Sequence, residues 1–265
     1  MKRGARRILL TGASSGIGRA LALRYASEGR SLALFGRDAA RLEAVAAECR
    51  TKGAEADVTV ADVRDRRGMA IRIAEADARE PLDLVIANAG VSTGLSPGQI
   101  VEDPEAVRGA LSINVNGVFN TVEPAIEAMC ARRRGQIAVV GSMAGLRGLP
   151  YSPAYCASKA AVHLYADSLR GALAPHGVHV SLIVPGFVTT PMTAKLKAWQ
   201  PGRMSDARAA EIIMRGLDKR AAVIAFPLFV YYAMKLFGLL PPRAVDSAMR
   251  LFEVAVPQTH EREEP

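Results

Sequence analysis

The chain has 265 residues, of which 50% are hydrophobic and 23% are charged, and its 34 basic and 26 acidic side chains give a net charge of +8. This composition excludes an intrinsically disordered chain, which needs low apolar content, and it excludes collagen-like and disulfide-rich chains, because glycine, proline and cysteine are not enriched. A chain of this length can bury a large core and needs neither a metal nor a disulfide to fold.

The positive charge is concentrated in two places. Neither is interleaved with aromatic residues, and no nucleic-acid-binding motif accompanies them, so we expect solvated faces and an attraction for an anionic ligand rather than nucleic-acid binding. The two places are the N-terminal residues Lys2, Arg3, Arg6 and Arg7 and the run Arg132, Arg133 and Arg134.

The three cysteines, Cys49, Cys130 and Cys156, are widely spaced and odd in number. This pattern is typical of reduced thiols rather than of a secreted disulfide framework. The basic start is followed by an apolar run at residues 8–10 only, which is too short for a signal peptide. We therefore expect a cytoplasmic protein.

Short apolar runs alternate with segments of helical periodicity along the chain. Strands are expected at residues 8–10, 31–35, 57–60, 82–87, 136–140, 178–184 and 223–226, and helices at 17–28, 39–50, 105–131 and 154–174. Strands that alternate with helices of this length pair in parallel through right-handed crossovers. The sequence therefore predicts an α/β protein with a single-domain Rossmann fold, a doubly wound parallel sheet with helices on both faces. No linker divides residues 1–265, and 228–265 is expected to form a C-terminal extension of that domain.

The first predicted strand runs into a glycine-rich turn that leads to a predicted helix. Its sequence is Thr11-Gly12-Ala13-Ser14-Ser15-Gly16-Ile17-Gly18, of the form T-G-x-x-x-G-x-G. Glycine allows a positive φ and a close approach of the backbone to a ligand, and the N-terminus of the following helix attracts a pyrophosphate. This context predicts dinucleotide binding.

The second predicted strand ends in Gly36, Arg37 and Asp38. Dinucleotide folds place an acidic residue on the ribose 2′-hydroxyl, or an arginine on the 2′-phosphate, at this point. Gly36 offers no carboxylate and Arg37 follows directly, which favours NADP(H) over NAD(H). In the alternative interpretation, Arg37 is a surface residue and Asp38 binds the ribose.

Tyr155 and Lys159 form a Y-x-x-x-K motif on a predicted helix. Residues four apart share one helical face, so the phenol and the ammonium group are expected to meet. A nearby cation stabilises the phenolate and lowers the pKa of the tyrosine, which suits it to exchange a proton with a carbonyl or alcohol oxygen. Without other motifs, a tyrosine and a lysine at this spacing are most often only a pair on the protein surface.

With these motifs the chain closely resembles the short-chain dehydrogenase/reductase superfamily over about residues 6 to 226. One departure is Ala87, where the family often has the first asparagine of N-N-A-G. Beyond the glycine-rich turn and Y-x-x-x-K, the matching positions are Asp62 with Val63, Asn88-Ala89-Gly90, Asn114 in N-x-x-G, Ser142, and Pro185-Gly186 followed by Val188 and Thr190.

The resemblance implies reversible, NADP(H)-dependent reduction of a ketone or aldehyde. Tyr155 is then the acid/base, Ser142 binds the substrate oxygen, Lys159 lowers the pKa of Tyr155 and holds the nicotinamide ribose, and Asn114 anchors a water in a proton relay. His163, His176 and His179 are interpreted as helix and strand residues, and no metal site is expected. The implied cofactor-binding residues are Gly12, Ser14, Ser15, Gly16, Ile17, Gly18, Arg37, Asp62, Val63, Asn88, Ala89, Gly90, Tyr155, Lys159, Pro185, Gly186, Val188 and Thr190.

Other functions remain open on the same fold. A catalytically idle nucleotide-binding regulator or a membrane scaffold would leave the intact set Asn114, Ser142, Tyr155 and Lys159 unexplained. An epimerase or a dehydratase on this fold would account for that set and remains an alternative.

The resemblance places the substrate pocket in loops with several apolar residues. Apolar walls favour a lipophilic carbonyl compound, although some of these side chains could simply pack, and Arg147 or Lys195 could meet an acidic head group. A long-chain-base or fatty-acyl ketone reduced at a membrane surface is the alternative. The expected pocket residues are Ser142, Met143, Leu149, Tyr155, Phe187 and Met192, with Leu146, Leu196 and Trp199 nearby.

Residues 221–234 are almost wholly apolar but too few to cross a bilayer, and they predict a buried strand followed by a helix. Two short helices, separated by Pro241 and Pro242, are expected to cap the substrate pocket or an oligomer contact, with peripheral contact at the inner face of a membrane as the alternative. The resemblance also implies a homodimer or homotetramer, paired through helices 105–131 and 154–174. The expected apolar stripe comprises Leu228, Phe229, Tyr232, Leu236 and Leu239, continued by Ala244, Met249 and Leu251.

Overall fold

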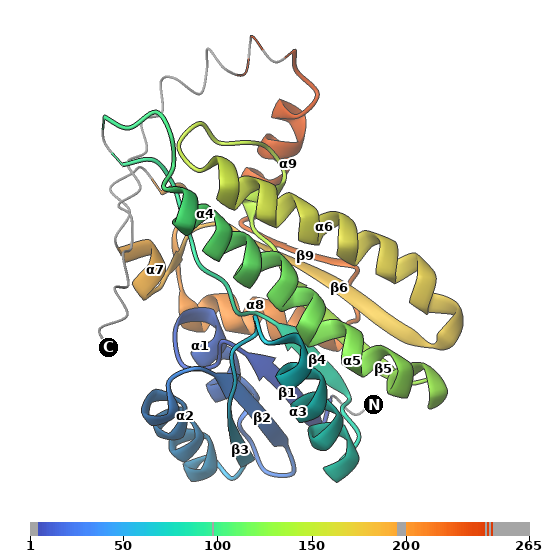
Figure 1. Cartoon of the computed structure of the whole chain (residues 1–265). Coiled ribbons are helices and arrows are strands. Elements are labelled where there is room, and N and C mark those ends of the chain that lie inside the picture. Colours follow the sequence, from blue (N-terminus) through green and yellow to red (C-terminus); the bar gives the residue numbers. More distant parts are fainter. Residues whose placement is uncertain (1–4, 97, 195–199, 242, 244, 246–265) are drawn as a thin grey trace.

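The computed structural model describes residues 5–96, 98–194, 200–241, 243 and 245. In this part of the chain, strands pair in parallel in the order β3-β2-β1-β4-β5-β6-β9 (Figure 1). They are β1 (Arg7–Thr11), β2 (Ser31–Gly36), β3 (Glu55–Val60), β4 (Leu84–Ala87), β5 (Gly135–Val140), β6 (Val178–Pro185) and β9 (Val223–Phe226), and a separate pair is formed by β7 (Val188–Thr189) and β8 (Met204–Ser205). The predicted doubly wound parallel sheet is confirmed.

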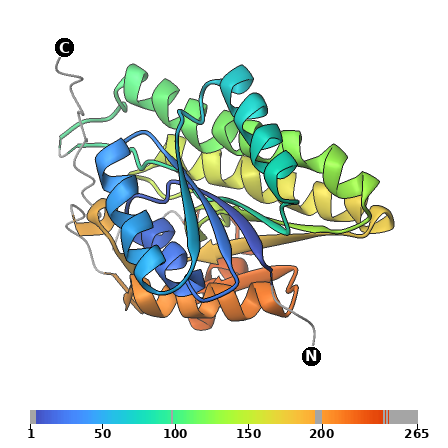
Figure 2. The same cartoon turned by 90° about the horizontal axis from the view of Figure 1, so that it is seen from below.

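Helices cover both faces of the sheet, with α1, α2 and α8 on one side and α3, α4, α5 and α6 on the other (Figure 2). Successive strand residues point to opposite faces. Ile8 and Leu10 therefore join the core under α1, α2 and α8, whereas Leu9 joins the core under α3, α5 and α6. The helices are α1 (Gly16–Tyr25), α2 (Ala39–Thr51), α3 (Arg66–Arg79), α4 (Pro104–Leu111), α5 (Gly117–Ala131), α6 (Pro153–Leu173), α7 (Pro191–Ala194), α8 (Asp206–Asp218) and α9 (Leu228–Phe237).

The order of the strands reverses at β1, which pairs with β2 on one side and with β4 on the other. In open α/β sheets, ligands bind at the carboxyl ends of the strands next to such a switch point. The turn after β1 and the loop after β4 therefore border the expected ligand crevice.

The first predicted helix is too long, because α1 ends at Tyr25 rather than at residue 28. Ala26 already has an extended backbone, and a tight turn follows in which Gly29 has a φ of +75°. Helices α3 and α8 were not predicted. Each has a cap, in which Asp65 accepts from the N–H of Gly68 and Ser205 from that of Arg208, and each buries an apolar stripe that periodicity could have revealed.

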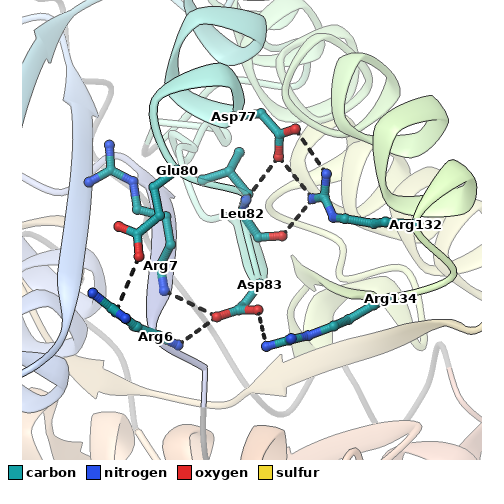
Figure 3. Close-up of polar contacts among 8 residues, drawn as sticks. All are labelled: Arg6, Arg7, Asp77, Glu80, Leu82, Asp83, Arg132 and Arg134. Carbon is teal, nitrogen blue, oxygen red and sulfur yellow. Dashed lines mark hydrogen bonds and ion pairs between the residues drawn. The ribbon is translucent and has the colours of Figure 1, made fainter.

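Arg133 and Arg134 of the basic run are exposed, as expected of a solvated face, and Arg132 is partly buried. Arg132 and Arg134 also form ion pairs, which the sequence did not reveal (Figure 3). The Arg132 guanidinium donates to both carboxylate oxygens of Asp77, at 2.8 and 2.9 Å, and to the carbonyl of Leu82 at 2.8 Å. Arg134 donates to Asp83 at 2.7 Å.

The Asp83 carboxylate also joins this cluster to β1 (Figure 3). It accepts from the backbone N–H groups of Arg6 and Arg7 at 2.8 and 3.3 Å, while the Arg6 guanidinium pairs with Glu80 at 3.2 Å. The cluster therefore ties the amino end of β1 to the loop before β4 and the loop before β5. The local positive charge is thus paired with carboxylates at the end of the sheet opposite the ligand crevice.

Candidate active site

A cleft of about 590 Å³ runs from the turn after β1 to helix α6. It gathers almost all the expected cofactor-binding residues, together with Ser142 and Met192. Gly18 and Asn114 are not among its lining residues. The predicted residues in its lining are Gly12, Ser14, Ser15, Gly16, Ile17, Arg37, Asp62, Val63, Asn88, Ala89, Gly90, Ser142, Tyr155, Lys159, Pro185, Gly186, Val188, Thr190 and Met192.

The glycine-rich turn uses its glycines in two ways. Gly12 and Gly16 have φ values of +67° and +51°, which favour glycine. A Cβ at Gly18 would lie 2.1 Å from the carbonyl oxygen of Gly12, so Gly18 allows α1 to pack against the turn. The Ser15 side chain at the start of α1 does not cap the helix, which leaves the N–H groups of its first turn to an anionic ligand.

The turn after β1 is braced against the end of β4. The Thr11 hydroxyl accepts from the N–H groups of Asn88 and Ala89, at 3.1 and 3.3 Å. The Asn88 amide donates to the carbonyl of Thr11 at 2.9 Å. Asn88 therefore shapes the floor of the cleft, and Ala87 before it is buried in β4, where it needs no polar side chain.

The far end of the cleft is rich in guanidinium groups, since Arg37 and Arg41 both line it. Asp38 is the N-cap of α2, where its carboxylate accepts from the N–H of Arg41 at 2.9 Å. Asp62 accepts from the Arg64 guanidinium at 2.6 Å, and this hydrogen bond holds the pKa of Asp62 below its usual value. Arg41 was missed by the sequence analysis, although it lies four residues after Arg37.

Helix α6 brings Tyr155 and Lys159 to the other end of the cleft, as the motif predicts. Lys159 is buried and its ammonium group donates to the carbonyl of Val140, the last residue of β5, at 3.0 Å. The ammonium lies 5.8 Å from the centre of the Tyr155 ring. Burial lowers the pKa of Lys159 to about 8, because an ammonium group is poorly solvated there.

Tyr155 differs from expectation in the direction of its pKa shift. Burial raises the pKa of Tyr155 above its ordinary value, because it disfavours the phenolate, and a hydrogen bond with the Ser142 side chain opposes this shift. The expected lowering by Lys159 is not a cause of the shift in this geometry, since the ammonium group is directed to Val140. Burial therefore favours the protonated phenol over the phenolate.

Ser142 follows β5 and caps a short 3₁₀ turn over Met143–Gly145. Its hydroxyl oxygen accepts from the N–H of Ala144 at 3.2 Å, and its carbonyl accepts from the N–H of Gly145 at 3.0 Å. The hydrogen of the Ser142 hydroxyl group can then be donated to the Tyr155 oxygen. Ser142 and Tyr155 thus place two O–H groups side by side at the cleft.

Asn114 lies behind the cleft, in a π-helical turn (Ser112–Asn116) between α4 and α5. This turn interrupts the helix that the sequence predicts as continuous. π-helical turns within helices are frequent at functional sites. The Asn114 amide oxygen accepts from the N–H of Val91 at 2.8 Å, and its amide nitrogen donates to the carbonyl of Val91 and the hydroxyl of Ser158 at 2.9 and 3.0 Å. Asn114 therefore connects the loop after β4 to α6.

The expected substrate residues are only partly brought together. Met192 lines the cleft beside Thr193, which the sequence analysis missed, and Met143 is buried nearby. Leu149 instead lines a separate depression outside α6, with Leu146 and Arg147, and Phe187 is not in the cleft lining. Lys195, Leu196 and Trp199 lie outside the described residues.

Helix α9 presents an apolar stripe to solvent. Its first turn lies near the cleft, since a Cβ at Gly202 would be 3.2 Å from the Phe229 ring and one at Gly186 3.0 Å from Pro227. The predicted strand and helix at residues 221–234 are confirmed as β9 and α9. The side chains of the stripe are exposed, and Ala244, Met249 and Leu251 lie outside the described residues. Exposed fractions range from 59% to 82% for Leu228, Phe229, Tyr232 and Leu236 of α9 and for Leu239 just after it.

Neither a metal site nor a membrane span emerges from the described ranges. No three His, Cys, Asp or Glu residues in them are grouped so that they could hold a metal ion. None of the helices found there combines the length and the apolar character needed to cross a membrane.

The chain is similar in sequence to a known family and to known proteins. Residues 6–201, which include the whole lining of the cleft, match the family described as short chain dehydrogenase. The chain is 37% identical to an uncharacterized oxidoreductase of Myxococcus xanthus, over 92% of this chain and 96% of that relative. It is 35% identical to the galactitol 2-dehydrogenase (L-tagatose-forming) of Cereibacter sphaeroides, over 71% of this chain and 73% of the relative.

A solved structure shares the fold over nearly the same extent. It is a short-chain dehydrogenase from Sphingobium yanoikuyae in complex with NADPH, with a TM-score of 0.76 and 26% sequence identity. The match covers 92% of this chain and 94% of that one. The two proteins thus share the fold.

Proposed function

Because this chain belongs to the short-chain dehydrogenase/reductase family, we propose that it uses NADPH to reduce a lipophilic ketone or aldehyde to an alcohol, reversibly. The chain is an oxidoreductase of the class that acts on CH–OH groups. The observation that carries the finer proposal is the arrangement of the cleft, with Ser142, Tyr155 and Lys159 at one end and Arg37 and Arg41 at the other.

The cleft suits an extended anionic dinucleotide. At Gly90, which lines the cleft, a Cβ would lie 3.2 Å from the Asn114 amide oxygen and 3.4 Å from the Lys159 ammonium group, so glycine leaves these two groups their room. The uncapped start of α1 would hold the pyrophosphate. Arg37 and Arg41 would hold a 2′-phosphate, whereas Asp38, which also lines the cleft, uses one carboxylate oxygen as the cap of α2. The NADPH complex of the solved relative supports the same choice of cofactor.

The nicotinamide cofactor supplies or accepts the hydride, and the chain supplies position and a proton. Ser142 and Tyr155 both line the cleft, where their O–H groups would turn to a substrate and orient its carbonyl oxygen between them. Tyr155 then gives its proton to that oxygen. We propose that Lys159, whose ammonium group donates to Val140 in this structure and lies 5.8 Å from the centre of the Tyr155 ring, turns to the phenolate once it forms and stabilises it by its positive charge.

Apolar walls support a lipophilic substrate. Ile113, Pro191 and Met192 line the cleft, and the exposed stripe of α9 begins beside it. The same stripe favours a second candidate function, reduction of a long-chain-base or fatty-acyl ketone at a membrane surface. We propose a cytoplasmic location for either function, peripheral at the inner face of a membrane for the second.

A chain-length series of ketones tests the proposed function. We expect NADPH oxidation with methyl ketones, and kcat/KM should rise as the alkyl chain lengthens, because each buried methylene adds about 0.8 kcal/mol of binding energy. The measurement is the loss of NADPH absorbance under matched conditions. Preference for a polyol with NAD⁺ would contradict the proposal, and long-chain substrates that react only with added vesicles would favour the membrane alternative.

The α9 stripe is proposed as an oligomer contact that adds to pairing through α5 and α6. Phe229→Glu with Leu236→Glu should lower the mass of the particle measured by light scattering, because charges replace apolar contacts. Ala44→Glu with Ala47→Glu adds the same charges on the exposed face of α2 and should leave the mass unchanged.

Wild-type protein should scatter as a dimer or a tetramer. A single 28.2 kDa species at micromolar concentration would overturn the proposed assembly. Unchanged mass in the α9 variant, with loss of binding to anionic vesicles, would assign the stripe to a membrane surface instead.

A further inference from the structure

Helix α6 continues the row of Tyr155 and Lys159 with a third polar residue, His163. The three residues are spaced four apart, so they lie on one helical face. His163 is 7% exposed, and its ring lies against the loop that carries Ser142. The sequence analysis interpreted His163 only as a helix residue.

The contact between His163 and the loop is direct. The backbone N–H of Ser142 donates to Nε2 of His163 at 3.3 Å. Glycines on both sides of Ser142 make room for the ring, since a Cβ at Gly141 would lie 2.3 Å from Nε2 and one at Gly145 would lie 2.9 Å from it. The ring therefore occupies space that almost any other residues at these two positions would fill.

Apart from the hydrogen bond between its side chain and Tyr155, the other hydrogen bonds of Ser142 are local. Its hydroxyl oxygen and its carbonyl accept from Ala144 and Gly145, two and three residues further on. These bonds give the turn its shape but do not place it relative to α6. The bond to His163 does so, and the bond from Lys159 to the carbonyl of Val140 holds the chain on the other side of Gly141.

The imidazole stays neutral in this position. Burial, and then the charge of Lys159, lower the pKa of His163 to about 4, against opposing effects of Asp167 and of a hydrogen bond with the Ser142 backbone. A neutral ring that accepts at Nε2 carries its proton on Nδ1.

We propose that His163 is a positioning residue, whose neutral imidazole holds the Ser142 backbone so that the Ser142 hydroxyl meets Tyr155 and the substrate oxygen. The inference rests on the proposed function, because it assigns His163 a role in the same reaction. It adds a third residue of α6 to the site, although His163 touches neither substrate nor cofactor.

Four variants test this role through turnover. His163→Leu should lower kcat roughly 10- to 100-fold with little change in NADPH affinity, because a misplaced hydroxyl weakens transition-state contacts. His163→Gln offers another acceptor and should restore most of the loss. In a Ser142→Ala background, His163→Leu should have little further effect, because the hydroxyl that it positions is already absent.

Val162→Ala is the matched control, since Val162 is buried in α6 and packs in the core. It should lower the unfolding temperature without lowering kcat of the folded enzyme. Equal losses from His163→Leu in the wild-type and Ser142→Ala backgrounds would overturn the proposal, as would a kcat within about twofold of wild type.

A measurement without turnover separates this inference from the proposed function. In ¹⁵N-labelled wild-type protein at neutral pH, the imidazole shifts of His163 should show an unprotonated Nε2 and a protonated Nδ1. A protonated Nε2 would overturn the role of His163 even if the enzyme reduces ketones. Lack of turnover with every carbonyl compound would instead overturn the proposed function.

Discussion

Replacing Tyr155 with phenylalanine should lower the rate of carbonyl reduction by roughly 10²- to 10⁴-fold, the range that a general acid contributes. Phenylalanine keeps the ring in the cleft but removes the O–H that meets Ser142. Binding of NADPH, measured by fluorescence, should change little, because the glycine-rich turn and the Arg37 end of the cleft are untouched. A variant that kept about a tenth or more of wild-type turnover would remove Tyr155 from the role of acid.

The pH dependence of the same assay distinguishes Tyr155 from Lys159. Burial raises the pKa of Tyr155, so the phenol keeps its proton through the neutral range. Burial lowers the pKa of Lys159 to about 8, so its positive charge is lost as the pH rises through that value. Reduction should therefore slow on the alkaline side of about pH 8. Lys159→Met should be slow throughout and lack this alkaline decline.

The second large effect is expected at the opposite end of the cleft. Arg37→Ala should weaken NADPH binding roughly 10- to 150-fold, which corresponds to about 1.5–3 kcal/mol for charge-assisted hydrogen bonds. NADH binding should change far less, because only NADPH carries the 2′-phosphate that a guanidinium recognises. Dissociation constants for both cofactors, measured by calorimetry at one salt concentration, check this expectation.

Arg170→Ala is a suitable control for the loss of one positive charge. Arg170 lies on α6 and pairs with Asp167 at 2.8 Å, away from the cleft lining. It should leave both dissociation constants unchanged. Wild-type protein that binds NADH at least as tightly as NADPH would contradict the proposed cofactor preference, and Asp38 would then be the residue to test.

Local sequence patterns determined the class of fold and most of the cleft. Alternating apolar strands and periodic helices predicted the parallel sheet, and Thr11–Gly18 and Tyr155 with Lys159 predicted both ends of the cleft. These features could be read from the sequence because each motif lies within one turn or one helix. The carboxyl ends of parallel strands then bring such segments to one edge of the sheet.

Contacts between distant segments were decided only by the tertiary structure. The sequence does not reveal that Lys159 is directed to Val140, that His163 reaches Ser142, or that Leu149 lies outside the cleft. The direction of the Tyr155 pKa shift also depended on burial, which spacing along a helix does not report.

The surroundings of the basic run at residues 132–134 and of the apolar stripe of α9 could not be predicted from local sequence patterns, for one physical reason. The basic run stays largely exposed, and the turn after α5 also brings Arg132 to Asp77 and Arg134 to Asp83. The stripe of α9 has the spacing of a buried face, yet the fold leaves it exposed. Periodicity identifies which side chains share a face, whereas the packing of the other elements decides whether that face meets protein or solvent.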